Sequence, residues 1–209
     1  AELEGEELNG RIKQLHRHIC AVQCRQYLGA HRDVAGGVDL EGVKSEVASL
    51  VEEYRYTLDL NKGAVGGQKE VQHGDELVLL AAEMLRNVWT DLLKAGDDLG
   101  CVRCQLDSVL LLEYGRTCSP YNYQIKIMLL DLYMALGSFE AGIMLFNELD
   151  VKQIQCDSLS WLLLPGCSSC GFFNEVRAQV NNVQHVHRLA ARDASEYIVK
   201  AYQCGNFTR

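Results

Sequence analysis

The sequence has 209 residues, of which 48% are hydrophobic and only two are proline. This composition argues against a disordered chain and favours long helices, because proline breaks the helical hydrogen-bond ladder. The formal net charge of −8 argues against direct binding of DNA through general electrostatics, since neutralising phosphates requires a surplus of Lys and Arg.

Two further features bear on the compartment. The longest fully apolar run, Leu77 to Ala82, is far too short to cross a hydrocarbon layer about 30 Å thick, so no membrane span is expected. The nine cysteines are odd in number, and nothing at the start of the sequence resembles a signal peptide. We therefore expect reduced thiols in a cytoplasmic protein.

The first region, residues 1–121, is expected to form irregular helical pairs. Apolar residues at helical spacing predict one helix that ends near Gly29 and another from about Val43 to Leu58. A third stretch, from Asp75 to Lys94, carries apolar residues on more than one face, which predicts a buried helix. A shorter helix is expected from Cys101 to Tyr114.

After Pro120 the pattern predicts an antiparallel pair of helices over residues 123–156. The first has apolar residues at i, i+3, i+4 and i+7 and is ended by Gly137. The second begins almost at once at Ser138, and Phe146 belongs to its inner face. Because the connection is so short, the two helices must form a tight hairpin.

The motif Gly-x-Phe occurs three times at a period of 34 residues, which is the length of a tetratricopeptide repeat (TPR). In such a repeat the glycine ends the first helix, and the aromatic residue two positions later packs the second helix against it. The residues expected to build the repeats are Tyr133, Gly137, Phe139, Phe146, Gly171, Phe173, Gly205 and Phe207.

The period divides residues 122–209 into repeats at 123–156, 157–190 and 191–209. Pro165 and Gly166 fall inside the expected first helix of the second repeat, which predicts a kink or an early stop there. The third repeat reaches only Arg209 and is expected to be truncated. The fold class expected is all-α, an α-α superhelix (TPR-like solenoid) of antiparallel helix pairs.

Three segments resemble the auxiliary, non-catalytic subunit family of the NatB N-terminal acetyltransferase complex. The segment Leu149–Leu159 (LDVKQIQCDSL) matches in order and spacing, Ala194–Tyr202 resembles a second family segment, and His73–Ala82 a third. The resemblance suggests that residues 10–209 align with the middle of the family's chain.

This resemblance implies a helical scaffold that binds a catalytic acetyltransferase subunit and positions it at the ribosome. The catalytic partner acetylates nascent chains that begin Met-Asp, Met-Glu, Met-Asn or Met-Gln. The scaffold itself is not an enzyme, so no catalytic, cofactor-binding or metal residues are expected. The candidate partner-binding residues are Lys152, Gln153, Gln155 and Asp157.

Two explanations of these polar residues stay open. The segment either forms the turn between repeats, with Asp157 capping the next helix, or presents a surface to the acetyltransferase complex. Capping accounts for Asp157 but not for the other three residues.

Patterns that suggest chemistry each have a structural alternative. Gln26–His31 approaches an acetyl-CoA phosphate loop but fails at its last position, so we read Gly29 as a helix C-cap. Gly37 and Gly42 have P-loop spacing, but Val43 interrupts the motif.

The pairs Cys101 with Cys104 and Cys167 with Cys170 are too far apart for a zinc ribbon. The stripe of His16, Cys20 and Cys24 has no evident fourth ligand.

An alternative function is that of a generic TPR adaptor or co-chaperone that holds peptide segments in its concave groove. Such modules place Lys, Arg and Asn on the first helix of each repeat, where this sequence offers mainly Lys126. Separately, the N-terminal helix, which is expected to end near Gly29, is locally basic. This charge suits either contact with ribosomal RNA or a solvated helix face.

Overall fold

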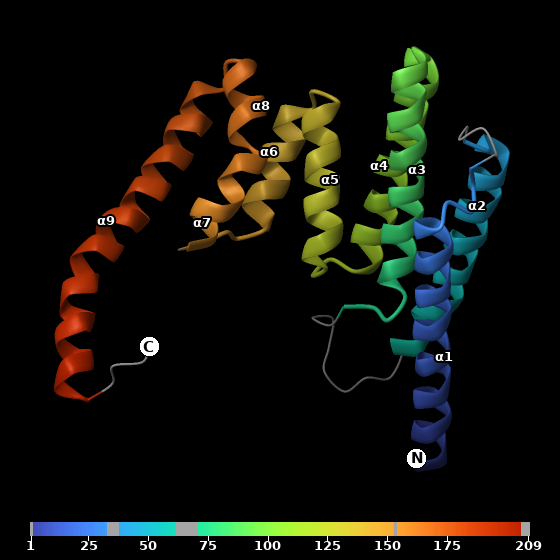
Figure 1. The fold of residues 1–209 in the computed structure, drawn as a ribbon, viewed down its shortest axis with the longest axis horizontal. Helices are drawn as coiled ribbons and strands as arrows, with labels where there is room; N and C mark the ends of the chain where they lie inside the picture. Colours follow the sequence, from blue (N-terminus) through green and yellow to red (C-terminus); the bar gives the residue numbers. More distant parts are fainter. Residues whose placement is uncertain (1, 33–37, 62–70, 153, 206–209) are drawn as a thin grey trace. The chain divides into compact units, whose positions relative to one another are not determined.

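The computed structural model describes residues 2–32, 38–61, 71–152 and 154–205. Its regular elements over these ranges are helices, and the one pairing of extended backbone there is an isolated bridge between Arg32 and Val38. The expected all-α class is confirmed, and helices pack against one another within each part of the chain (Figure 1). The chain divides into two compact units, residues 1–132 and 133–209, which are described separately.

The first unit contains four long helices and most of a fifth. They are α1 (Glu2–Tyr27), α2 (Leu40–Thr57), which a short 3-10 turn η1 (Leu58–Asn61) extends, α3 (Asp75–Ala95), α4 (Asp98–Cys118) and α5 (Tyr123–Ala135). Leu15, Ile19 and Val22 form the buried stripe of α1, as their spacing predicts.

Helix α3 is at the centre of the first unit and contacts α1, α2 and α4 (Figure 1). Contact on several sides explains why its apolar residues cover more than one face, as the sequence indicates. The buried residues include Leu77, Val78, Leu80, Ala81, Ala82, Met84, Leu85 and Val88. Helix α3 ends at Gly96, whose φ of 77° lies in the left-handed region that glycine adopts without strain.

Helices α3 and α4 approach each other closely at Gly115 of α4. A Cβ added there would lie 2.9 Å from Cγ1 of Val78 and 3.3 Å from Cδ1 of Ile125. Only a residue without a side chain allows α4 to contact both α3 and α5 at this point.

The second unit contains α6 (Phe139–Glu148), α7 (Ile154–Leu159), a 3-10 turn η2 (Ser160–Leu162), α8 (Leu164–Ser169) and α9 (Phe173–Gln203). Two short helices with a turn between them therefore replace the long first helix expected for the second repeat. Helix α7 stops before Pro165, which occupies the first turn of α8. The helix is thus interrupted at residues 160–163, before the expected position, and Pro165 and Gly166 themselves belong to α8.

The three glycines of the 34-residue motif all follow the end of a helix. Gly137, Gly171 and Gly205 have φ values of 75°, 85° and 67°, and they lie two residues after the ends of α5, α8 and α9. This is the conformation that the expected role at a helix C-terminus requires.

The aromatic positions of the motif differ from one another. Phe146 is buried, whereas Phe139 is only half-buried and its ring lies 5.8 Å from that of Phe172. Phe173 is 65% exposed, so the packing expected of it is not seen, because Phe172, immediately before α9, takes the inward position instead. Phe207 lies outside the described residues.

Helix α9 runs without a break through residues 190 and 191, where the sequence placed a boundary between repeats. None of its described residues is buried, since α7 and α8 contact it on one side only. The division of residues 122–209 into three repeats stays a prediction.

Candidate functional site

The turn between α6 and α7 holds the candidate partner-binding residues. Helix α6 ends at its C-cap Leu149, and Asp150 adopts a φ of 50°, which turns the chain away from the helix axis. The Lys152 ammonium forms an ion pair with the Asp150 carboxylate. The backbone N–H of Gln155 donates to the Lys152 carbonyl at 3.0 Å, and the Lys152 N–H donates to Oε1 of Gln155 at 3.4 Å.

Lys152 and Gln155 therefore close the turn with reciprocal hydrogen bonds, and both side chains remain exposed. Gln153 lies outside the described residues. The side chain of Lys152 is 69% exposed, so most of its surface is available to a partner while its charge is shared with Asp150.

The expectation that Asp157 caps the next helix is wrong. Asp157 lies inside α7, whose first residue is Ile154, so its carboxylate is past the position from which a side chain caps a helix. Its Oδ1 lies 3.1 Å from Nε2 of His187 on α9 instead. His187 thus has a partner, although both side chains are more than half exposed. The pair links α7 to α9.

Beneath this polar surface the α7–α8 segment packs through small and aliphatic side chains. Cys156, Leu162, Leu163 and Cys167 are buried. Trp161, the middle residue of η2, is 64% exposed. The sequence pattern does not identify Trp161 as a candidate, because it begins an apolar run that is typical of a buried core. An exposed tryptophan is a frequent anchor of protein interfaces.

Gly166 explains how α8 fits against its neighbours. A Cβ at this position would lie 2.9 Å from Cε1 of Phe139 and 3.1 Å from Sδ of Met134. The absence of a side chain at Gly166 therefore lets the backbone of α8 lie close to the side chains of Phe139 and Met134.

A buried carboxylate organises the first unit. Asp75, the first residue of α3, is 2% exposed and accepts four hydrogen bonds. The donors are the hydroxyl of Tyr54 at 3.0 Å, the backbone N–H of Gln72 at 3.1 Å, the hydroxyl of Ser119 at 2.6 Å and Nδ2 of Asn122 at 2.8 Å. These four donors and Asp75 form what we call the Asp75 cluster.

The Asp75 cluster joins α2, α3 and the connection between α4 and α5. Its position at the N-terminus of α3 places a negative charge where the helix dipole favours it. The Oδ1 atom of Asn122 accepts from the N–H of Gln124 at 2.9 Å, so the same side chain also caps α5. Burial, and secondarily the charge of Asp75, raises the pKa of Tyr54 well above its ordinary range. Because the carboxylate is surrounded by donors in the interior, its arrangement is structural.

The thiols considered for metal binding differ in their exposure. Across the described ranges, no group of three or more His, Cys, Asp and Glu side chains is placed to hold a metal ion. Cys101, Cys104 and Cys167 are buried, and burial is the main cause that raises the pKa of each thiol above its ordinary value. Cys20, Cys24 and Cys170 are exposed.

The two Gly-rich patterns have local structural roles. Gly29 has a φ of 77° just after α1, which is the helix end that the sequence suggests. The N–H of Gly42 donates to Oδ1 of Asp39 at 3.0 Å, so the Asp39 side chain caps the N-terminus of α2. Gly37 lies outside the described residues.

Among the helices that the structure describes, none combines the length and the apolar character that a membrane span requires.

The family described as "N-acetyltransferase B complex (NatB) non catalytic subunit" matches residues 1–209 of the chain. The chain is 32% identical to the human "N-alpha-acetyltransferase 25, NatB auxiliary subunit" and 31% identical to its mouse counterpart, over 95% of this chain and 19% of each relative. It is 29% identical to the "N-terminal acetyltransferase B complex subunit arm1" of Schizosaccharomyces pombe, over 73% of this chain and 18% of the relative. The chain thus spans about a fifth of the length of the curated relatives it matches.

Proposed function

The chain belongs to the family of non-catalytic subunits of the N-acetyltransferase B (NatB) complex, and from this we propose that it forms part of the scaffold that binds and positions the catalytic acetyltransferase subunit. Because the family is the non-catalytic subunit, the chain is not itself the enzyme. The match over the whole chain, together with the all-helical architecture, is the observation that carries the proposal.

The substrates in this proposal are nascent chains that begin Met-Asp, Met-Glu, Met-Asn or Met-Gln. The scaffold contributes by holding the catalytic subunit near the ribosome in the cytoplasm, and its own mechanism is binding. Stacked helix pairs suit this role, because a solenoid presents an extended surface that one globular partner can contact at many points.

Within the scaffold, the α6–α7 turn is proposed as one point of contact. Lys152 of the turn and Trp161 of the following η2 support this, since both are exposed and tryptophan is a frequent anchor of interfaces. Gln155 and Asp157 have internal partners, which favours a structural contribution from these two residues.

The test uses the intact subunit co-expressed with a NatB catalytic subunit. The variant Lys152→Ala with Gln153→Ala and the variant Trp161→Ala are purified by a tag on the scaffold, and the amount of catalytic subunit that co-purifies is measured. The matched control is Lys44→Ala with Gln23→Ala, because Lys44 is also an exposed lysine in an ion pair, here with Glu41.

Each outcome has one interpretation. Reduced co-purification at an unchanged melting temperature supports a contact surface at the turn. A lowered melting temperature assigns the residues to the structure of the turn. If the unaltered subunit does not retain the catalytic subunit at all, the scaffold function is contradicted.

A further inference from the structure

The first unit contains a groove to which the proposed function assigns no residue. Between the end of α1 and α3 lies a cavity of about 340 Å³, and beside it, towards the end of α3, lies a second of about 380 Å³. Both cavities are lined by Val38, Val88 and Asp91, so they adjoin. We call the two together the Asp91 groove.

The floor of the groove is apolar, and its rim carries both polar and large apolar side chains. Val43, Met84 and Val88 line the first cavity and are at most 4% exposed, so they belong to the core. Tyr27 and Leu28 line the same cavity but are 93% and 82% exposed. Two large apolar side chains held in solvent beside a cavity of this size are typical of a surface that a partner covers.

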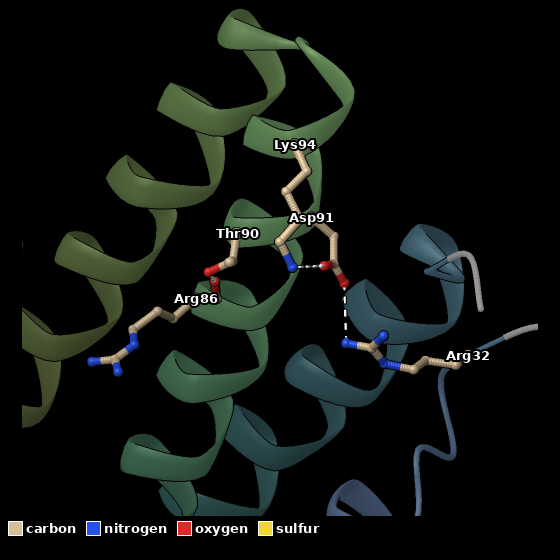
Figure 2. Close-up of polar contacts among 5 residues, drawn as sticks. All are labelled: Arg32, Arg86, Thr90, Asp91 and Lys94. Atoms are coloured by element: carbon tan, nitrogen blue, oxygen red, sulfur yellow. Dashed lines mark hydrogen bonds and ion pairs between the residues drawn. The ribbon is translucent and has the colours of Figure 1, made fainter.

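The charged residues of the groove form a defined arrangement (Figure 2). Asp91 of α3 receives Nη2 of Arg32 at 3.2 Å and, at its other oxygen, Nζ of Lys94 at 3.1 Å. Figure 2 shows Arg32 reaching α3 from the segment that follows α1, whereas Arg86, on the same helix as Asp91, points to the opposite side.

The cations of this arrangement face outward, and the carboxylate is set back. The side chains of Arg32 and Lys94 are 52% and 71% exposed, and that of Asp91 is 22% exposed. Two cations around one carboxylate leave a net positive charge, and the exposed groups that a partner meets first are positive. His31 also lines the first cavity. The groove therefore complements negative charge at its mouth and apolar groups at its floor.

We propose that the Asp91 groove binds a short acidic peptide segment that inserts a large apolar side chain between α1 and α3. The apolar side chain fills the first cavity against Val88 and Met84 and is covered by Tyr27 and Leu28. Carboxylates of the peptide pair with Arg32 and Lys94. Both cations are exposed and carry further N–H donors besides those that contact Asp91. Each part of the proposal uses a group that the structure places at the groove.

The probe is a fluorescein-labelled peptide in which glutamates surround a central leucine, titrated with the intact subunit and followed by fluorescence anisotropy. Arg32→Glu is expected to weaken binding about fivefold, because it replaces an attraction at the rim by a repulsion. Arg86→Glu is the matched control, since it changes the charge of the subunit by the same amount from a residue that does not line the groove. Its affinity is expected to be unchanged.

A second pair of variants tests the apolar anchor. Leu28→Ala together with Tyr27→Ala is expected to weaken binding about tenfold, whereas Tyr56→Ala, at another exposed tyrosine, on α2 and outside this groove, is expected to leave it unchanged. These side chains are in solvent, so the variants keep the fold, which an unchanged melting temperature shows.

Three results overturn the proposal. The first is no saturable binding of the acidic peptide. The second is equal binding of a peptide in which lysines replace the glutamates. The third is an equal loss of affinity in Arg32→Glu and Arg86→Glu, which means that net charge alone attracts the probe.

Discussion

Removal of the Asp75 carboxylate is expected to destabilise the first unit strongly. In Asp75→Ala the donors of Tyr54, Ser119 and Asn122, all buried, lose their common acceptor. Each buried donor left without a partner costs about 1 to 3 kcal/mol, and water that enters the new cavity recovers part of this. We expect a loss of about 3 to 5 kcal/mol, a large share of the stability of a typical domain.

Asp75→Asn separates the role of the acceptors from that of volume. It keeps the shape of the side chain and one oxygen, but its amide group then faces donors where the second oxygen stood, so we expect a loss of about 2 to 3 kcal/mol. Glu76→Ala, at the exposed neighbouring residue, is the control and is expected to change stability by less than about 0.5 kcal/mol.

The assay is urea unfolding of the chain, followed by circular dichroism, with the free energy of unfolding compared among the variants. A value for Asp75→Ala within about 1 kcal/mol of the unaltered chain would contradict this expectation, because the donors would then have found other partners at little cost.

Two other changes test the packing of the first unit. Because burial raises the pKa of Tyr54, the neutral phenol favours the folded state, so its contribution is complete below about pH 10 and declines above it by up to about 1.4 kcal/mol per pH unit. The stability difference between the unaltered chain and Tyr54→Phe should therefore shrink as urea unfolding is repeated at rising alkaline pH, and a constant difference would contradict this. Gly115→Val, whose side chain would clash with Val78 and Ile125, is expected to cost about 1 to 3 kcal/mol in the same assay. An unchanged stability would show that α4 can move away from α3.

Local sequence patterns predict the helices well because each depends on neighbours a few residues apart. The spacing of Leu15, Ile19 and Val22 identifies the buried face of α1, and the apolar residues all round α3 indicate its central position. Gly137 and Gly171 mark helix ends, since the left-handed conformation needed there favours glycine.

The repeat pattern is less informative about how helices continue. Residues 190 and 191 lie inside α9, because nothing in this stretch breaks a helix, whatever the period of the Gly-x-Phe motif. Phe172 rather than Phe173 contacts Phe139, and a one-residue choice at a helix start depends on packing that spacing alone does not determine.

The polar clusters depend on contacts that are distant in the sequence. Asp75 meets Ser119 and Asn122 from more than forty residues away, with separations of 44 and 47 residues. Arg32 meets Asp91 across 59 residues. At the level of sequence these are ordinary polar residues near helix ends, and only the folded arrangement of α1 to α5 shows which of them share a site.

A chimeric subunit shows whether this chain acts as a segment of a NatB scaffold. The matching segment of the human relative, which is 32% identical over 198 residues, is replaced by this chain, and the chimera is co-expressed with the human catalytic subunit. We predict that the catalytic subunit co-purifies with the chimera and that the complex acetylates peptides beginning Met-Asp or Met-Glu. A chimera with the melting temperature of the human subunit that neither retains the catalytic subunit nor supports acetylation would contradict the account.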